Sequence, residues 1–362
     1  MDRRSFLRTS ALGGTAAAAA STLAAPAYAQ GKRTLTFVTT WGRGLAGVHD
    51  AVMYYADNVT AMTDGQLIID VKAAGELVGA FEVFDAVTSG QADMYHGADY
   101  YFVGQHPGYG FFTAVPFGMT AQEIVNWYYQ DGGKELHDEL GQIFGLKSFL
   151  AGNTGAQSGG WFAKEIKGPE DFVGLKFRMP GLGGKALGKL GASVQNLPGS
   201  EVYQALASGA IDGTEWIGPW ADEKAGFQEI TKIYYTAGFH EPGAALSVAF
   251  NRDVFDSLTP AQQKICEEAA AAAHQWNLSL FLANNSAALQ RLVAAGVQTK
   301  EFPDSVWDAF GKASQEVHDE NLGDPLYKKI YDSAMASMKK SSAWIKLSDG
   351  AYTRQRDRVL GG

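Results

Sequence analysis

A segment of twelve residues occurs twice in this chain, and this repeat constrains the fold more than any other feature. Residues 82–93 (EVFDAVTSGQAD) and 201–212 (EVYQALASGAID) are identical at six of the twelve positions. In each copy a short helical pattern ends at a glycine, the residue that most readily adopts the left-handed conformation that closes a helix. A β-rich segment follows each copy. The repeat therefore predicts two structurally related lobes.

The segments around the repeats alternate between strand and helix patterns. Residues 34–39 and 66–71 are β-rich, and residues 49–62 between them carry apolar side chains at helical spacing. The same alternation starts again after about residue 125. Alternation of this kind predicts an α/β fold with mainly parallel sheets and helices on their faces.

The last third of the chain is predicted to be helical. Thr259 and Gln262, with a proline between them, form a helix start with a capping box. The helical pattern that follows would be roughly 54 Å long at 1.5 Å per residue, so we expect a helix that either bridges both lobes or kinks near residues 284–285. A second long pattern occupies residues 324–362, and its apolar face suggests a partner subunit or docking on its own chain.

The first 29 residues resemble an export signal. Arg3 and Arg4 precede an Ala-rich apolar run that ends in a small-x-small sequence at residues 27–29. The arginine pair is typical of the twin-arginine route, and the run is shorter than the ~20 residues that a membrane span needs. We therefore expect residues 1–29 to be a twin-arginine signal peptide and the mature chain to reach the periplasm.

Composition and missing motifs exclude several classes of protein. The net charge of −9 disfavours nucleic acid, because Lys and Arg must neutralise its phosphates. The single cysteine, Cys266, excludes an intramolecular disulfide and a Cys-based zinc site. No HExxH, GxSxG or CxxC motif is found, and no catalytic residue is predicted. Residues 181–186 (GLGGKA) match a dinucleotide-binding pattern, but Pro180 breaks the turn, so we interpret the match as chance.

Charged and polar side chains between residues 151 and 241 are the best candidates for a binding site. Arg178 ends a predicted strand, where side chains face the ligand crevice of an α/β sheet, and its planar guanidinium matches a carboxylate. Glu215 occupies the equivalent strand end after the second repeat. With Gln157 and Glu241 it offers oxygen donors that suit a hard cation rather than zinc. Taken alone, the same residues are also compatible with independent surface charges.

Aromatic side chains offer walls for a small pocket. Tyr100 and Tyr101 are adjacent, and Trp161 and Trp216 each occur in a predicted strand. Small-molecule pockets are lined mainly by apolar and aromatic side chains, although such residues are equally common in a core.

The order of several motifs resembles one family of binding proteins. Residues 34–42 (TLTFVTTWG) come first, residues 177–180 (FRMP) follow, and Glu201 and Tyr203 then begin a segment that ends at Asp212-Gly213. This order is similar to that of the extracytoplasmic solute-binding subunits of TRAP transporters, the DctP family, over essentially the whole chain after residue 29. The surroundings of Gln157 and Glu215 are similar to those in the branch that binds 2-oxo or 2-hydroxy acids.

The resemblance implies a two-lobe flytrap of the periplasmic-binding-protein type II class, with a long bridging helix and a C-terminal dimerisation helix. It implies lobe I over residues 30–150, with later parts of the chain returning to it, and lobe II over residues 151–250. Residues 251–323 are expected to form the bridging helix and a return to lobe I. Residues 324–362 are expected to form a helix that two subunits of a homodimer exchange.

The resemblance also implies the residues of the site. Arg178 is expected to pair with the carboxylate of the solute, and a cation, Na⁺ or alternatively Ca²⁺, is expected beside it. The expected ligands of the cation are Gln157, Glu215, the carbonyl group of Trp216, and Glu241. The expected contacts of the solute are Arg178, Asn153, Gln157, Trp216, Tyr100 and Tyr101.

The predicted function is that of a receptor without catalytic activity. It would capture a small 2-oxo or 2-hydroxy carboxylate, in particular a 2-oxo monocarboxylate such as pyruvate, and deliver it to the permease subunits in the membrane. The alternative is an exported metal-dependent enzyme that acts on small carboxylic acids. A sensor domain is a third alternative, but the sequence contains no signalling segment to couple it.

Overall fold

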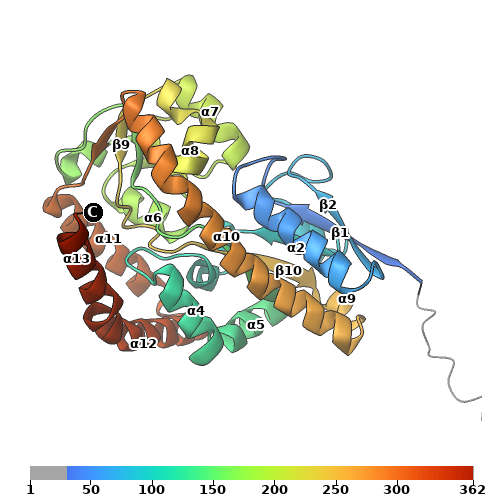
Figure 1. Cartoon of the computed structure of the whole chain (residues 1–362). Helices are drawn as coiled ribbons and strands as arrows, with labels where there is room; N and C mark the ends of the chain where they lie inside the picture. The colour runs from blue at the N-terminus through green and yellow to red at the C-terminus, as the bar shows by residue number, and fades with distance from the viewer. Residues whose placement is uncertain (1–30, 362) are drawn as a thin grey trace, which may run out of the picture. The chain divides into compact units, whose positions relative to one another are not determined.

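The structure is a computed structural model that describes residues 31–361. The expected signal peptide, residues 1–29, lies outside the described residues. Residues from Thr34 onward form one compact unit, which contains two β-sheets with helices packed on them (Figure 1). The two-lobe α/β architecture expected from the repeat is therefore present.

The first lobe is built on a five-stranded sheet with the order β2-β1-β3-β10-β4. Every residue of the central strand β3 is buried, because helices cover both faces of the sheet. The strands are β1 (Arg33–Thr39), β2 (Leu67–Lys72), β3 (Met94–Gly97), β4 (Leu146–Asn153) and β10 (Ala245–Asn251). The helices are α2 (Val48–Met62), α3 (Val83–Thr88), α4 (Ala121–Gln130), α5 (Gly133–Ile143) and α9 (Arg252–Asp256), with the 3-10 helices η2 (Asp99–Phe102) and η3 (Pro107–Phe112).

The second lobe is built on a six-stranded sheet with the order β11-β9-β5-β8-β6-β7. Its strands are β5 (Gly160–Phe162), β6 (Lys176–Arg178), β7 (Ser193–Gln195), β8 (Gly213–Thr214), β9 (Ile233–Tyr235) and β11 (Gln298–Lys300). Its helices are α6 (Gly181–Lys189), α7 (Gly199–Ala207), α8 (Pro219–Ala225) and α11 (Asp304–Asn321), with the 3-10 helices η4 (Pro169–Phe172) and η5 (Phe227–Glu229).

One antiparallel strand interrupts each sheet. β1, β3 and β4 of the first sheet run in one direction, and so do the strands of the second sheet other than β5, so the sheets are mainly parallel as predicted. β10 lies antiparallel between β3 and β4, and β5 lies antiparallel between β8 and β9. The path of the chain explains both cases. Each of these strands enters its sheet directly from the other lobe, at the edge where the parallel strands end, and so runs in the opposite direction.

The two copies of the repeat play the same structural part in the two lobes. Each helix of the repeat is followed by a glycine with positive φ, Gly90 at 78° and Gly209 at 72°. The aspartate that ends each copy then joins two parallel strands. Asp93 Oδ2 accepts a hydrogen bond from the Thr36 backbone over 2.7 Å, and Asp212 Oδ2 accepts one from the Lys176 backbone over 2.9 Å. The structural duplication extends to these hydrogen bonds.

α10 (Pro260–Ala294) is one uninterrupted helix of 35 residues that runs along both lobes (Figure 1). Asn277 of this helix contacts the first lobe at two points. Its Nδ2 donates to the Gly47 carbonyl over 2.8 Å, and its Oδ1 accepts from the backbone of Asn153, the last residue of β4, over 3.0 Å. Two turns later, Asn285 Oδ1 accepts from the Trp220 backbone of the second lobe over 3.1 Å. Of the two sequence alternatives, a bridging helix is the one observed.

The segments around α10 differ from the expected domain boundaries. β10 belongs to the first sheet, although it lies mostly within residues 151–250. After α10 the chain joins the second lobe rather than returning to lobe I, because β11 pairs with β9 and α11 packs on α6. It reaches the first lobe only with α12 (Pro325–Leu347), which packs on α4 and α5 and leads into α13 (Asp349–Leu360). Among the described residues, no helix combines the length and apolar character needed to cross a membrane.

Candidate functional site

β6 ends at Arg178, whose side chain is 1% exposed. Its guanidinium pairs with the carboxylate of Glu215, and its Nη2 lies 3.4 Å from the hydroxyl of Tyr101. Burial alone would lower the pKa of Arg178, but the Glu215 carboxylate raises it above the usual value. Arg178 therefore carries a fixed positive charge in a buried site.

Glu215 and Trp216 lie beside Arg178 because β8 runs parallel to β6. Glu215 is fully buried, and its Oε2 has no hydrogen-bond partner and lies 3.5 Å from Nε2 of His240. The Trp216 indole covers the guanidinium, with Arg178 Cζ 5.3 Å from the ring centroid. Gly199 leaves room for this indole, because a Cβ there would lie only 2.1 Å from Trp216 Cη2.

The two strand crossings between the lobes bring Gln157 and Glu241 to the same place. The backbone N–H of Gln157 donates to the carbonyl oxygen of Glu241 over 3.0 Å. The side-chain Nε2 of Gln157 donates to Thr154 Oγ1 over 3.0 Å, while its Oε1 has no hydrogen-bond partner. Burial, together with the neighbouring Glu215 carboxylate, raises the pKa of Glu241 well above its usual range.

These side chains fit a cation. Glu215, His240 and Glu241 are buried, and they present ligand atoms that all lie within 4.8 Å of one another. Gln157, Glu215 and Glu241 each keep one buried oxygen without a hydrogen-bond partner. Buried polar atoms are normally paired, and oxygen donors are those that hard cations prefer. The sequence prediction contained the three oxygen donors but missed His240, whose only signal was its place beside Glu241.

A small cavity shares several residues with this cluster. Tyr100 and Tyr101 line it from η2, and Trp216 lines it from the second lobe. Burial raises the pKa of both tyrosines, so their hydroxyl groups stay protonated and can donate hydrogen bonds. The residues that line the cavity are Trp41, Val48, Tyr100, Tyr101, Thr154, Gln157, Trp216, Ile217 and Leu246.

Comparison with known proteins identifies the family. Residues 37–323 match the family model DctP, described as bacterial extracellular solute-binding protein, family 7. The chain belongs to the DctP family.

Relatives of this DctP-family chain include proteins of known ligand. A monocarboxylate 2-oxoacid-binding periplasmic protein of Nostoc sp. is 39% identical over 315 residues, which cover 87% of this chain and 86% of that protein. A TRAP solute-binding protein of Colwellia psychrerythraea, solved with calcium and pyruvate, is 39% identical, with a TM-score of 0.87 over 90% of this chain and 99% of the other. One from Pseudoalteromonas atlantica, solved with sodium and pyruvate, is also 39% identical, with a TM-score of 0.86 over 89% of this chain and 99% of the other.

Family membership decides the class of function. This DctP-family chain is a solute-binding receptor of a TRAP transporter, and not an enzyme. A receptor of this family works in the periplasm and transfers its solute to the permease subunits in the membrane.

Two of the predicted pocket residues lie elsewhere. The side chain of Asn153 fixes the end of β4, where the chain leaves the first lobe. Its Oδ1 accepts a hydrogen bond from the Gly155 backbone over 2.8 Å, and its Nδ2 lies 3.4 Å from His274 Nε2. Trp161 is fully buried beneath the sheet, where its Nε1 donates to Asp222 Oδ2 over 2.9 Å. Neither residue lines the cavity.

The glycine-rich run at the start of α6 has a packing role, which supports its interpretation as a chance match to a dinucleotide motif. A Cβ at Gly181 would lie 3.0 Å from Tyr100 Cβ, and a Cβ at Gly184 would lie 2.2 Å from the Met179 carbonyl oxygen. These glycines let α6 approach the first lobe and its own preceding strand.

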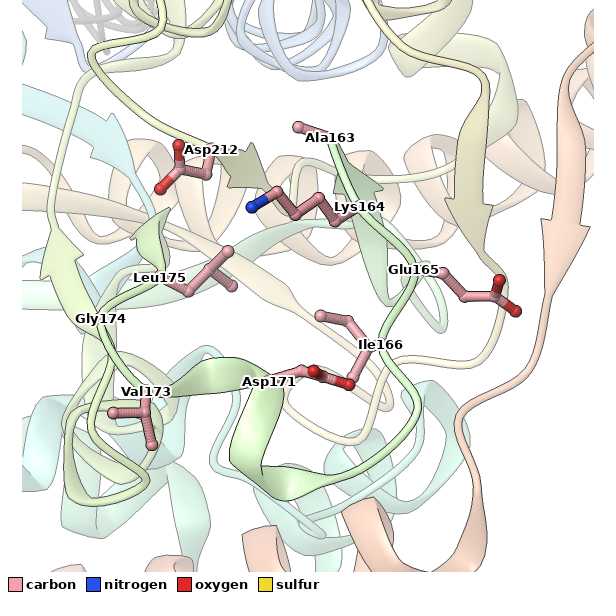
Figure 2. A pocket seen from close by; sticks show the side chains of 9 residues that line it. All are labelled: Ala163, Lys164, Glu165, Ile166, Asp171, Val173, Gly174, Leu175 and Asp212. Atoms are coloured by element: carbon pink, nitrogen blue, oxygen red, sulfur yellow. The ribbon is translucent and has the colours of Figure 1, made fainter.

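A second hollow lies at the opposite edge of the second sheet. Leu175 precedes β6 and Asp212 precedes β8, so this hollow is at the amino ends of the two strands whose carboxyl ends carry Arg178 and Glu215. In Figure 2 the side chain of Lys164 extends toward Asp212 at this hollow. It contains none of the candidate site residues.

Proposed function

We propose that this DctP-family receptor captures a small 2-oxo monocarboxylate, such as pyruvate, together with a cation in the cleft between the lobes. The observation that carries the proposal is the buried cluster around Arg178, in which Gln157, Glu215 and Glu241 each keep one oxygen without a hydrogen-bond partner. The pyruvate that accompanies a cation in two structures of 39% identity supports the choice of solute.

Each residue has a distinct part in this proposal. Arg178 would pair with the carboxylate of the solute, and Tyr100 and Tyr101 would donate to its oxygens. The cation would supply positive charge beside Glu215 and Glu241 and would polarise the 2-oxo group. Gln157 Oε1, Glu215, the Trp216 carbonyl group and Glu241 would hold it.

The charges of the cluster favour binding of the cation and the carboxylate solute together. The raised pKa of Glu241 favours its neutral form when no cation is bound, whereas a bound cation would favour the ionised form. With both carboxylates ionised, Arg178, Glu215 and Glu241 would have a net charge of about −1, and the positive charge of the cation would offset their repulsion of a carboxylate solute. The proposed cation is sodium or, alternatively, calcium, because one relative was solved with each ion.

Calorimetric titration with pyruvate tests the proposal. We expect saturable binding without product formation, weaker binding after chelation or dialysis against sodium-free buffer, and recovery on addition of the correct ion. Glu215→Gln should weaken binding and reduce its dependence on the cation. Equal affinity with and without cations would contradict the proposed role of the cation. No pyruvate binding in any buffer would contradict pyruvate as the solute.

We also propose that the chain uses the twin-arginine route, because Arg3 and Arg4 precede its apolar leader. Replacing both arginines by lysine should leave the protein in the cytoplasmic fraction of cells that express it. Unchanged periplasmic yield would contradict this route.

We further propose that the C-terminal helices pair two copies of the chain into a homodimer. Their exposed apolar side chains support this, since Trp344 is 69% exposed and Leu347 is 75% exposed. Sedimentation should report a dimer, and Leu347→Asp should shift it toward monomer. A monomeric wild-type protein would contradict the proposal.

A further inference from the structure

The first lobe supplies apolar residues to the cavity that stand apart from the ionic cluster. Trp41 follows β1, Val48 begins α2, and Leu246 lies in β10, and all three line the cavity. They are 1–3% exposed. A 2-oxo acid whose carboxylate pairs with Arg178 has its side chain at the opposite end of the molecule, and these residues are positioned to receive it.

Contacts of both its ring and its backbone hold Trp41 in place. Its Nε1–H donates to Nδ1 of His96 over 2.9 Å, and its ring meets the Tyr101 ring edge-on with centroids 6.0 Å apart. Its backbone N–H donates to Thr39 Oγ1 over 3.3 Å, and its carbonyl oxygen accepts from the Ala74 backbone over 2.9 Å. The indole is therefore a rigid wall.

His96 accepts the hydrogen bond of the indole N–H, the one polar group of the Trp41 side chain. His96 lies fully buried in β3, at the centre of the first sheet. Burial lowers its pKa to about 3, so the imidazole stays neutral and its Nδ1 keeps the lone pair that accepts the indole N–H. Trp41 then presents only carbon to the cavity.

An apolar wall of this kind discriminates between solutes in two ways. A longer or branched side chain meets a rigid indole that cannot move aside without breaking its bond to His96. A second carboxylate would lose its hydration and find no donor from Trp41, Val48 or Leu246, and burying an unpaired charge is strongly unfavourable.

We propose that Trp41, positioned by His96, limits the length and polarity of the side chain that a 2-oxo acid can present to this receptor. The inference rests on the proposed function of the cleft. It adds that the receptor selects solutes by the side chain at the end opposite the carboxylate, and that Trp41 makes this selection.

The experiment compares a ladder of solutes by calorimetry: pyruvate, 2-oxobutanoate, 2-oxopentanoate, 4-methyl-2-oxopentanoate and 2-oxoglutarate. For the wild type we expect affinity to fall by at least ~10-fold between pyruvate and 2-oxopentanoate, and 2-oxoglutarate to bind at least ~100-fold more weakly than pyruvate. Trp41→Phe removes ring volume and the N–H. In this variant the ratio of the affinity for pyruvate to that for 2-oxopentanoate should fall by at least ~5-fold.

Two further variants make the result specific. Trp276→Phe replaces a tryptophan of α10 that stacks on Tyr54 and does not line the cavity, so it should leave the relative affinities for the five solutes unchanged. Val48→Ala enlarges the same end of the cavity and leaves Trp41 unchanged, so it should also lower the ratio of pyruvate to 2-oxopentanoate affinity. This variant tests the inference even if Trp41→Phe does not fold.

The outcomes separate this inference from the proposed function. Equal affinity of the wild type for all five solutes, or a ladder that neither cavity variant alters, would overturn the role of Trp41 while pyruvate binding stands. A wild-type protein that binds none of the solutes would overturn the proposed function, and the present inference with it.

Discussion

At the scale of single residues, Arg178 has the most direct consequence for binding. Arg178→Met keeps much of the side-chain length and removes the charge. We expect pyruvate affinity to fall by at least tens-fold, because the solute carboxylate and Glu215 would both be buried without the guanidinium, and breaking a buried ion pair costs ~3–5 kcal/mol. Calorimetric titration measures the change.

The control for this variant is Arg291→Met, which removes an arginine that is 55% exposed and pairs with Glu223 on the surface. Its pyruvate affinity should stay within about twofold of the wild type, since an exposed ion pair contributes ~0–1 kcal/mol. A folded Arg178→Met protein that binds as well as this control would contradict the assignment of Arg178.

Gly199 is predicted to matter because of the ring that it accommodates. A Cβ at Gly199 would lie 2.1 Å from Trp216 Cη2, so Gly199→Ala should displace the indole from Arg178. We expect affinity to fall at least tenfold, since overpacking of this kind costs ~1–3 kcal/mol. Gly188→Ala is the matched control, because a Cβ at Gly188 of α6 meets nothing within 4 Å. Equal binding by the two variants would show that the position of Trp216 is unimportant.

Some residues of the site could be predicted from the sequence, and others depend on tertiary structure. Arg178 is the last residue of β6 and Glu215 directly follows β8. Parallel strands end at the same edge of a sheet, so the proximity of these two side chains follows from local pattern. His240 and Glu241 approach the same place from a crossing between the lobes, where no periodicity indicates the direction of a side chain. The contact of Asn153 with the solute stays a prediction, because its side chain bonds within the crossing and does not line the cavity.

At the scale of elements, α10 is predicted to stabilise the crossing between the lobes through Asn277. Asn277→Ala leaves the backbone N–H of Asn153 and the carbonyl of Gly47 without their partner. An unsatisfied buried polar group costs ~1–3 kcal/mol, so we expect the free energy of unfolding to fall by about 2–5 kcal/mol. Urea denaturation followed by circular dichroism measures it.

Asn284 provides a control on the same helix. Its Nδ2 donates to the Leu280 carbonyl within α10 and contacts neither lobe through that bond. Asn284→Ala should change the free energy of unfolding by less than ~1 kcal/mol. Similar losses from the two alanine variants would mean that Asn277 contributes no more than an ordinary helical asparagine.

The ends of elements were easier to predict than their directions in a sheet. The start of α10 follows from Thr259 and Gln262, because a capping box is a local interaction, and both hydrogen bonds of that box are present. The reversed directions of β5 and β10 are set by which lobe the chain has just left. That information lies in the tertiary path rather than in any short segment.

At the scale of the whole molecule, four connections join the lobes: the crossings after β4 and before β10, α10, and the passage from α11 to α12. The two crossings pair with each other, since the Thr154 backbone donates to the Ala244 carbonyl over 2.9 Å. A solute that contacts both lobes favours the closed arrangement by its differential affinity for that state. In the proposed site, Arg178 and Glu215 from the second lobe and Tyr101 from the first would supply the contacts that differ.

The pH dependence of stability is also a property of the whole molecule, because the responsible groups lie in different parts of it. Burial lowers the pKa of His96 to about 3, and those of His274 and His318 to about 4, whereas histidine in an unfolded chain titrates near ~6.5. The unfolded state therefore binds more protons below that pH. The stabilisation from these three neutral histidines is present above about pH 6.5 and is lost as the pH falls toward about 4.

Asp222 acts in the opposite direction within the same range. Burial raises its pKa to about 6, above the ~3.9 of an unfolded aspartate, so between these values the folded state binds the extra proton. Its contribution is present below about pH 4 and is lost as the pH rises through about 6. It offsets part of the loss caused by the histidines, each of which contributes on the order of 3 kcal/mol.

Urea denaturation at several pH values between about 7 and about 4.5 tests this balance. For the wild type we expect the free energy of unfolding to decrease on acidification, because the three histidines outweigh Asp222 and Glu241, whose raised pKa acts in the same direction as that of Asp222. His318→Gln, which can keep the hydrogen bond to Tyr327, removes one titrating group and should make the decrease shallower. Asp222→Asn keeps an acceptor for the Ile217 and Gly218 backbones and should make it steeper, because its offset is gone. Wild-type stability that rises on acidification, or two variants whose slopes change in the same direction, would contradict the assignment of these groups.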